Sequence, residues 1–165
     1  LMDLLKRFLK SEAMEMQENN IRLNSIGQMH RIPKGVRSVL QQTMDVTASN
    51  TGLTLNLALS YGGRAEIVEM VKQVAAQVRD GRLDPSAITS EVVSDNLYTR
   101  GMCDPDLLIR TGGDMRVSNF LLWQIAYAEI FVTDTLWPDF SREEFMTILG
   151  EFQRRERRFG RINQT

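Results

Sequence analysis

The feature that most constrains this 165-residue chain is a short apolar run that leads into a pair of glycines. Residues 107–109 (Leu-Leu-Ile) are bounded by turn-forming residues, which is typical of a strand covered on both faces. Gly112 and Gly113 follow, and glycine allows the positive φ of a tight turn and the close approach of backbone to a ligand. Ser118 or Asn119 is placed to cap a helix after the turn. The stretch therefore predicts a strand, a glycine turn and a helix start.

Two arginines bracket this turn and give it a chemical character. The guanidinium groups of Arg110 and Arg116 present planar sets of donors that match phosphate oxygens. Together with the Ser118 hydroxyl and the backbone amides of the turn, they predict a cradle for a diphosphate group. The competing interpretation is an ordinary strand-to-helix turn whose arginines pair with surface carboxylates. The residues alone leave both interpretations open.

Strand-like and helix-like segments alternate along the chain, which predicts a mostly parallel sheet flanked by helices. One segment, 119–128, is apolar nearly all round, as in a helix buried in a core or a subunit contact. A short helix is expected over 85–96. The remaining periodic segments predict strands at 21–25, 53–61, 107–109 and 130–132, and helices over 1–17, after Pro33, after Arg64 and after Ser141.

The last of these helices carries signals at both ends. Residues 141–144 (Ser-Arg-Glu-Glu) have the pattern of a capping box. Arginines follow near its C-terminus, where positive charges interact favourably with the helix dipole. The alternative is that they form a basic patch that binds a phosphate or a neighbouring subunit. The cations in question are Arg154, Arg155, Arg157, Arg158 and Arg161.

Composition excludes several classes of protein. The net charge of −1 gives no basic field for nucleic acid. A lone cysteine, Cys103, rules out an internal disulfide framework and fits a reducing cytosol. The single histidine, His30, cannot build a His-rich metal site. No apolar run approaches the ~18 residues of a membrane span, and the length suits one globular domain over 1–165.

Three segments of the chain closely resemble the cis-prenyltransferases, the undecaprenyl diphosphate synthase family. They are Arg-Thr-Gly-Gly-Asp-Met-Arg-Val-Ser-Asn-Phe-Leu-Leu-Trp-Gln at 110–124, Ala-Tyr-Ala-Glu at 126–129 and Leu-Trp-Pro-Asp-Phe at 136–140. The resemblance implies an α/β fold with a mostly parallel central sheet, a homodimer, and a cytoplasmic protein or one peripheral to the membrane. It also implies condensation of isopentenyl diphosphate onto an allylic, farnesyl-type diphosphate, with Mg²⁺ as cofactor. The product would be a membrane-associated polyprenyl diphosphate carrier for cell wall biogenesis.

The same resemblance assigns roles to individual residues. Arg110, Arg116, Val117 and Ser118 correspond to the pocket for the isopentenyl diphosphate head group. Glu129 corresponds to the acidic magnesium ligand of the family. A hard oxygen ligand suits Mg²⁺ that also binds phosphate oxygens, and neutralising a diphosphate leaving group lowers the barrier to its departure.

The spacing of two of these residues raises a question about the site. A straight helix from Ser118 to Glu129 separates them by about three turns, or roughly 16 Å. Either the chain folds back sharply, or Glu129 serves a site that is partly built by another subunit.

The chain departs from the family pattern at its beginning. It contains neither the glycine-rich Asp-Gly-Asn-Gly-Arg-like segment, whose Asp binds magnesium, nor the segment rich in Ser, Asn and Trp that follows it. An apolar helical face begins without a cap at Leu1. We therefore expect the C-terminal major part of a cis-prenyltransferase domain, incomplete at the N-terminus, with no catalytic residue of its own and inactive alone.

Two other functions compete with this one. A non-catalytic partner subunit of a prenyltransferase complex would also lack the Asp segment, although it would not need to keep both arginines and Glu129. A nucleotide-binding or regulatory α/β domain rests on fold analogy alone, and neither the G-x-G-x-x-G nor the P-loop pattern is present.

Overall fold

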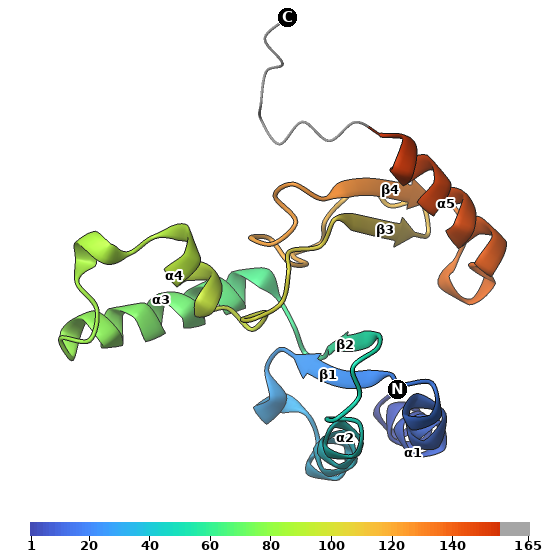
Figure 1. Ribbon diagram of the computed structural model, residues 1–165, viewed down its shortest axis with the longest axis horizontal. Coiled ribbons are helices and arrows are strands. Elements are labelled where there is room, and N and C mark those ends of the chain that lie inside the picture. The colour runs from blue at the N-terminus through green and yellow to red at the C-terminus, as the bar shows by residue number, and fades with distance from the viewer. Residues whose placement is uncertain (156–165) are drawn as a thin grey trace, which may run out of the picture. The chain divides into compact units, whose positions relative to one another are not determined.

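The computed structural model describes residues 1–155 of the chain. The chain divides into two compact units, Leu1–Gly101 and Met102–Thr165, and each contains a two-stranded parallel sheet with helices (Figure 1). The predicted α/β class with parallel strands is confirmed. The prediction of one domain over 1–165 concerns how the two units join, and it stays a prediction.

The first unit is built on a β–α–β arrangement. Strand β1 (Arg22–Ile26) pairs in parallel with β2 (Thr54–Ala58), and α2 (Lys34–Val46) lies between them in the sequence. Helix α1 (Met2–Glu18) packs beside α2, and both helices contact β1 (Figure 1). These elements match the predicted ones to within a few residues, because apolar side chains at regular spacing have one core to fill. The buried core residues are Leu9, Met16, Leu23, Val39 and Leu40.

The rest of the first unit is helical. Helix α3 (Gly63–Arg79) packs against the segment that contains α4 (Ser90–Asp95). The helix predicted over 85–96 is broken in two, since a 3₁₀ turn precedes α4 and is separated from it. The apolar contact between these segments is made by buried Met70, Val74 and Leu97. Three short 3₁₀ helices complete the elements of the described chain: η1 (Met29–Arg31), η2 (Pro85–Ala87) and η3 (Trp137–Asp139).

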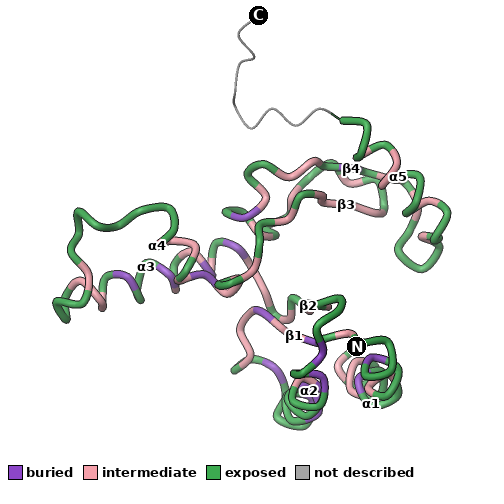
Figure 2. Tube along the Cα trace, in the orientation of Figure 1, coloured by how far each residue is buried: buried purple, intermediate pink, exposed green. Residues whose placement is uncertain are grey.

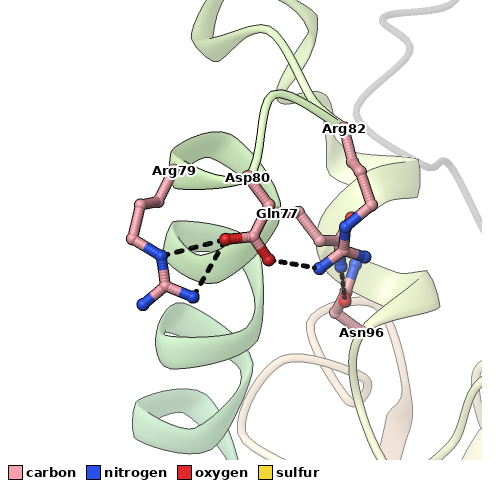
Figure 3. A network of polar contacts seen from close by, with 5 residues as sticks. All are labelled: Gln77, Arg79, Asp80, Arg82 and Asn96. Carbon is pink, nitrogen blue, oxygen red and sulfur yellow. Dashed lines mark hydrogen bonds and ion pairs between the residues drawn. The ribbon is translucent and has the colours of Figure 1, made fainter.

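A polar cluster closes the turn after α3 (Figure 3). The Asp80 carboxylate accepts from the guanidinium of Arg79 at 2.9 Å and from that of Arg82 at 3.0 Å. Hydrogen bonds from Arg82 and then Arg79 hold the pKa of Asp80 below its usual value. Gln77 donates to the side-chain oxygen of Asn96 at 2.7 Å, which ties α3 to the end of α4.

The second unit contains the sheet that carries the glycine turn. Strand β3 (Leu107–Thr111) pairs in parallel with β4 (Glu129–Thr133), with Leu107 opposite Glu129 and Thr111 opposite Thr133. Side chains alternate between the faces of a strand, so this register sorts the residues into two sets. One face carries Leu108, Arg110, Ile130 and Val132, and the other carries Leu107, Ile109, Thr111, Glu129, Phe131 and Thr133.

Helix α5 (Arg142–Arg154) is joined to the face of the sheet that carries Glu129 and Thr133. Thr133 donates through its hydroxyl to the Glu144 carboxylate, which joins α5 to β4. The predicted N-cap is confirmed, since Ser141 accepts from the Glu144 N–H at 3.1 Å. Buried residues are sparse in this unit as far as residue 155 (Figure 2), and they are Gln124, Phe131 and Ile148.

The helix predicted over 119–128 is wrong. These residues form successive turns instead. Ser118, Asn119 and Leu121 all have positive φ, between 45° and 63°, and residues in that conformation cannot continue a right-handed helix. Neither Ser118 nor Asn119 is therefore a helix cap, and the straight-helix separation of Ser118 from Glu129 no longer applies.

The predictions of an arginine cluster and of no membrane-spanning segment can be compared with residues 1–155. The predicted arginine cluster is described at Arg154, in the last turn of α5, and at Arg155, which follows it. Arg157, Arg158 and Arg161 lie outside the described residues. Within residues 1–155, no helix has both the length and the apolar character needed to cross a lipid bilayer.

Candidate diphosphate-binding site

A cavity of about 280 Å³ lies over the Arg110 face of the β3–β4 sheet. Its floor is apolar because Leu108, Ile130 and Val132 alternate with residues that point to the other face. Its wall is the segment that leaves β3 after the glycine turn. The residues lining the cavity are Leu108, Arg110, Asp114, Met115, Arg116, Val117, Ile130 and Val132.

The two predicted arginines meet in this cavity at a single oxygen atom. Arg110 Nη2 lies 3.2 Å from Asp114 Oδ2, and Arg116 Nη2 lies 2.6 Å from the same atom. Arg110 is held by strand pairing, whereas Arg116 comes from the loop after the turn, and its side chain is 68% exposed. Two guanidinium groups that share one anionic oxygen define a position where a phosphate group can be bound from two sides.

The glycine amides do not form the predicted cradle. Gly112 donates its N–H to the Thr135 carbonyl and Gly113 donates to the Thr133 carbonyl, each at 2.9 Å. These bonds tie the turn to the chain leaving β4, so the two amides are used within the protein. Both glycines have positive φ, and a Cβ on Gly113 would lie 2.7 Å from Asp134 Oδ1. The glycines therefore shape the turn that brings Arg116 to the cavity.

The remaining residues assigned to the head-group pocket lie beside the arginines. Val117 lines the cavity, next to Arg116. Ser118 is exposed and follows directly in the chain, with a φ of 50°. The structure thus brings Arg110, Arg116 and Val117 to one cavity, and Ser118 is not among the residues that line it.

Glu129 is not in this cavity. It begins β4 and shares the opposite face of the sheet with Phe131. Its carboxylate accepts from Arg155 Nη1 at 2.6 Å, and the Arg155 guanidinium lies 4.0 Å from the centre of the Phe131 ring. Cation–π contact and ion pairing therefore hold Arg155 over this face. Within one chain, the sheet itself separates Glu129 from Arg110.

Glu129 is compatible with one mode of magnesium binding. Among residues 1–155, no group of three or more His, Cys, Asp or Glu side chains is placed to hold a metal ion. Magnesium often binds through one or two carboxylates and completes its shell with water and substrate phosphates. A single carboxylate fits that mode, and residues 1–155 by themselves provide no all-protein cage around it.

Sequence reasoning missed the role of Asp114. The signal was present in the spacing Arg-x₃-Asp-x-Arg over 110–116, which places a carboxylate between two guanidinium groups across a turn. The competing interpretation, in which the two arginines pair with carboxylates, is thus partly right. Their partner, however, is Asp114, which lines the cavity itself.

Comparison with known protein families gives a match over nearly all of the chain. The prenyltransferase family, described as putative undecaprenyl diphosphate synthase, matches residues 1–160. An isoprenyl transferase of Porphyromonas gingivalis is 48% identical over 164 residues, covering 99% of this chain and 65% of that protein. Another, of Chlorobaculum tepidum, is 48% identical over 164 residues and covered over 62% of its length. The chain thus spans just under two thirds of these relatives.

Solved structures agree with this match. Lavandulyl diphosphate synthase from Lavandula x intermedia, in complex with dimethylallyl diphosphate, has a TM-score of 0.93 and 34% identity, with 97% of this chain and 70% of that chain covered. A probable undecaprenyl diphosphate synthase from Campylobacter jejuni has a TM-score of 0.83 and 38% identity, with 96% and 72% covered.

The Glu129–Arg155 pair should contribute little to stability. The two side chains are 27% and 44% exposed, and partly exposed ion pairs contribute about 1 kcal/mol or less because water and salt screen them. A double-mutant cycle with Glu129→Gln and Arg155→Ala, followed by urea unfolding, should give a coupling free energy in that range. A coupling free energy of several kcal/mol would show that the pair contributes strongly to the stability of the fold and is not an easily exchanged contact.

Proposed function

Because this chain belongs to the prenyltransferase family described as putative undecaprenyl diphosphate synthase, we propose that it binds isopentenyl diphosphate for cis-prenyl chain elongation. In the proposed reaction, the isopentenyl unit forms a new carbon–carbon bond to an allylic, farnesyl-type diphosphate. The carbon–oxygen bond of the allylic substrate breaks and its diphosphate group leaves, and the isopentenyl unit loses a proton as the new cis double bond forms. The observation that carries the proposal is the convergence of two guanidinium groups above an apolar strand face.

The chemistry of the cavity fits both ends of this substrate. Arg110 and Arg116 offer charge-assisted hydrogen bonds to a diphosphate, and such bonds are stronger than those between neutral groups. The floor made by Leu108, Ile130 and Val132 offers an apolar surface to a five-carbon hydrocarbon. We propose that the hydroxyl of Ser118, which follows Val117 in the chain and is exposed, donates to the same diphosphate, and that Val117 packs against the hydrocarbon.

The proposed role of Glu129 is to hold Mg²⁺ together with substrate phosphate oxygens. Bound there, the ion would neutralise charge on a diphosphate leaving group. Arg155 orients the free carboxylate through the hydrogen bond from its Nη1. Because Glu129 and Arg110 occupy opposite faces of one sheet, we propose that Glu129 completes a site whose arginines come from the second chain of a homodimer.

Replacing Arg116 tests the head-group pocket. Arg116→Ala should weaken the binding of isopentenyl diphosphate by about 1.5–3 kcal/mol, the range for a hydrogen bond to a charged group, or about 10- to 150-fold in Kd. Isothermal titration calorimetry measures this directly. Arg82→Ala is the matched control, since Arg82 is also exposed and paired with an Asp but does not line the cavity. Equal affinity of the Arg116→Ala and unmutated chains would contradict the assignment.

The shared-site proposal is tested by mixing two variants. A mixture of Glu129→Gln and Arg116→Ala chains should recover the part of isopentenyl diphosphate affinity that depends on Mg²⁺, since a mixed dimer contains one complete arginine–glutamate pair. Neither variant alone should show it. If the mixture recovers nothing although sedimentation shows a mass twice that of the 18.9-kDa chain, the sites are not shared in this way.

These 165 residues alone should not catalyse prenyl transfer. The sequence contains the isopentenyl side of the site but no Asp-Gly-Asn-Gly-Arg-like segment for the allylic diphosphate. Incubation with labelled isopentenyl diphosphate, farnesyl diphosphate and Mg²⁺ should leave no label in the lipid extract. Incorporation above the level of an Arg110→Ala control would show that the allylic side is formed by other residues of this chain.

A further inference from the structure

The carboxylate of Asp114 lies where the two cavity arginines converge. We propose that Asp114 is an internal counter-anion, which occupies the anion position between Arg110 and Arg116 and exchanges with the diphosphate of the ligand. This inference rests on the proposed function of the cavity and adds a residue that tunes its affinity. Asp114 would act through the arginines, so it is a positioning residue and not a catalytic one.

The contact geometry favours exchange over permanent pairing. Arginine binds a carboxylate most firmly through two parallel bonds to two oxygens. Here both guanidinium groups use the same atom, Asp114 Oδ2, at 3.2 and 2.6 Å. A diphosphate has several oxygens on two phosphorus atoms and can give each guanidinium its own acceptors. The ligand therefore satisfies more donors than Asp114 does.

The exposure and the charge of these three side chains also favour exchange of Asp114 with a ligand. The side chains of Arg110, Asp114 and Arg116 are 31%, 42% and 68% exposed, and ion pairs this open to water are weak. Asp114 reduces the charge of the three-residue cluster from +2 to +1. Its carboxylate thus keeps two like charges together in the free chain, and at the same time it lowers their attraction for an incoming anion.

The chain contains a second carboxylate shared by two arginines, which serves as a control. Asp80 binds Arg79 through Oδ1 and Arg82 through Oδ2 (Figure 3), and none of the three lines the cavity over β3–β4. Removing the charge of Asp80 changes the net charge of the protein by the same amount as removing that of Asp114. Any difference between the two variants therefore reports on position rather than total charge.

Titration of the 165-residue chain with inorganic pyrophosphate in the presence of EDTA tests the inference without any metal. Asp114→Asn should bind pyrophosphate roughly 3- to 10-fold more tightly than the unmutated chain, the change expected when a weak exposed ion pair no longer competes. Asp114→Glu, which retains the carboxylate, and Asp80→Asn should both bind as the unmutated chain does. Unchanged or weaker binding by a folded Asp114→Asn chain would overturn the inference.

A second measurement does not depend on how any variant folds. In the unmutated chain, the carboxyl ¹³C resonance of Asp114 should shift as pyrophosphate is added, while that of Asp80 should not. A constant Asp114 resonance at saturation would overturn the exchange. Failure of the cavity itself has a different signature, because the unmutated and Arg116→Ala chains would then bind pyrophosphate equally or not at all. Loss of binding in Arg116→Ala without a gain in Asp114→Asn refutes only the role of Asp114.

Discussion

The parallel register between β3 and β4 is the constraint on which the site depends. Because Leu107 pairs with Glu129, every side chain of the two strands is assigned to one face or the other. Arg110 is thereby placed above an apolar floor, and Glu129 is placed on the reverse side with Phe131. A shift of one residue would exchange the two sets and remove the arginine from its cavity. The glycine turn supports this register by donating its amides to the chain that leaves β4.

Each face of this sheet carries its own cluster of opposite charges. Arg110 and Arg116 share Asp114 on one face, and Arg155 pairs with Glu129 on the other. All of these side chains keep partial contact with water, so the pairs add little to the stability of the fold. Weak pairs at predetermined positions can be exchanged for a ligand at low cost. The arrangement therefore suits binding of anions and cations better than it suits structural reinforcement.

Much of this architecture was predictable from local pattern. The strands and most helices follow apolar spacing, and the Ser141 cap follows its motif. Arg110 and Arg116 were predictable as partners because a two-glycine turn returns the chain toward its own strand. The failure at 119–128 has a physical cause, since apolar composition says nothing about the sign of φ, which is positive at Ser118, Asn119 and Leu121. The carbonyl partners of the glycine amides belong to Thr133, at the end of β4, and to Thr135 beyond it. They lie about 20 residues along the chain from the glycines, so the local sequence pattern could not predict them.

The most direct test of the central claim is a crystal structure of the chain with isopentenyl diphosphate. We expect the diphosphate to lie between the guanidinium groups of Arg110 and Arg116, near the position of Asp114 Oδ2. The five-carbon tail should lie against Leu108, Ile130 and Val132. A ligand bound elsewhere, with both arginines still paired to Asp114, would show that the cavity is not the isopentenyl diphosphate site.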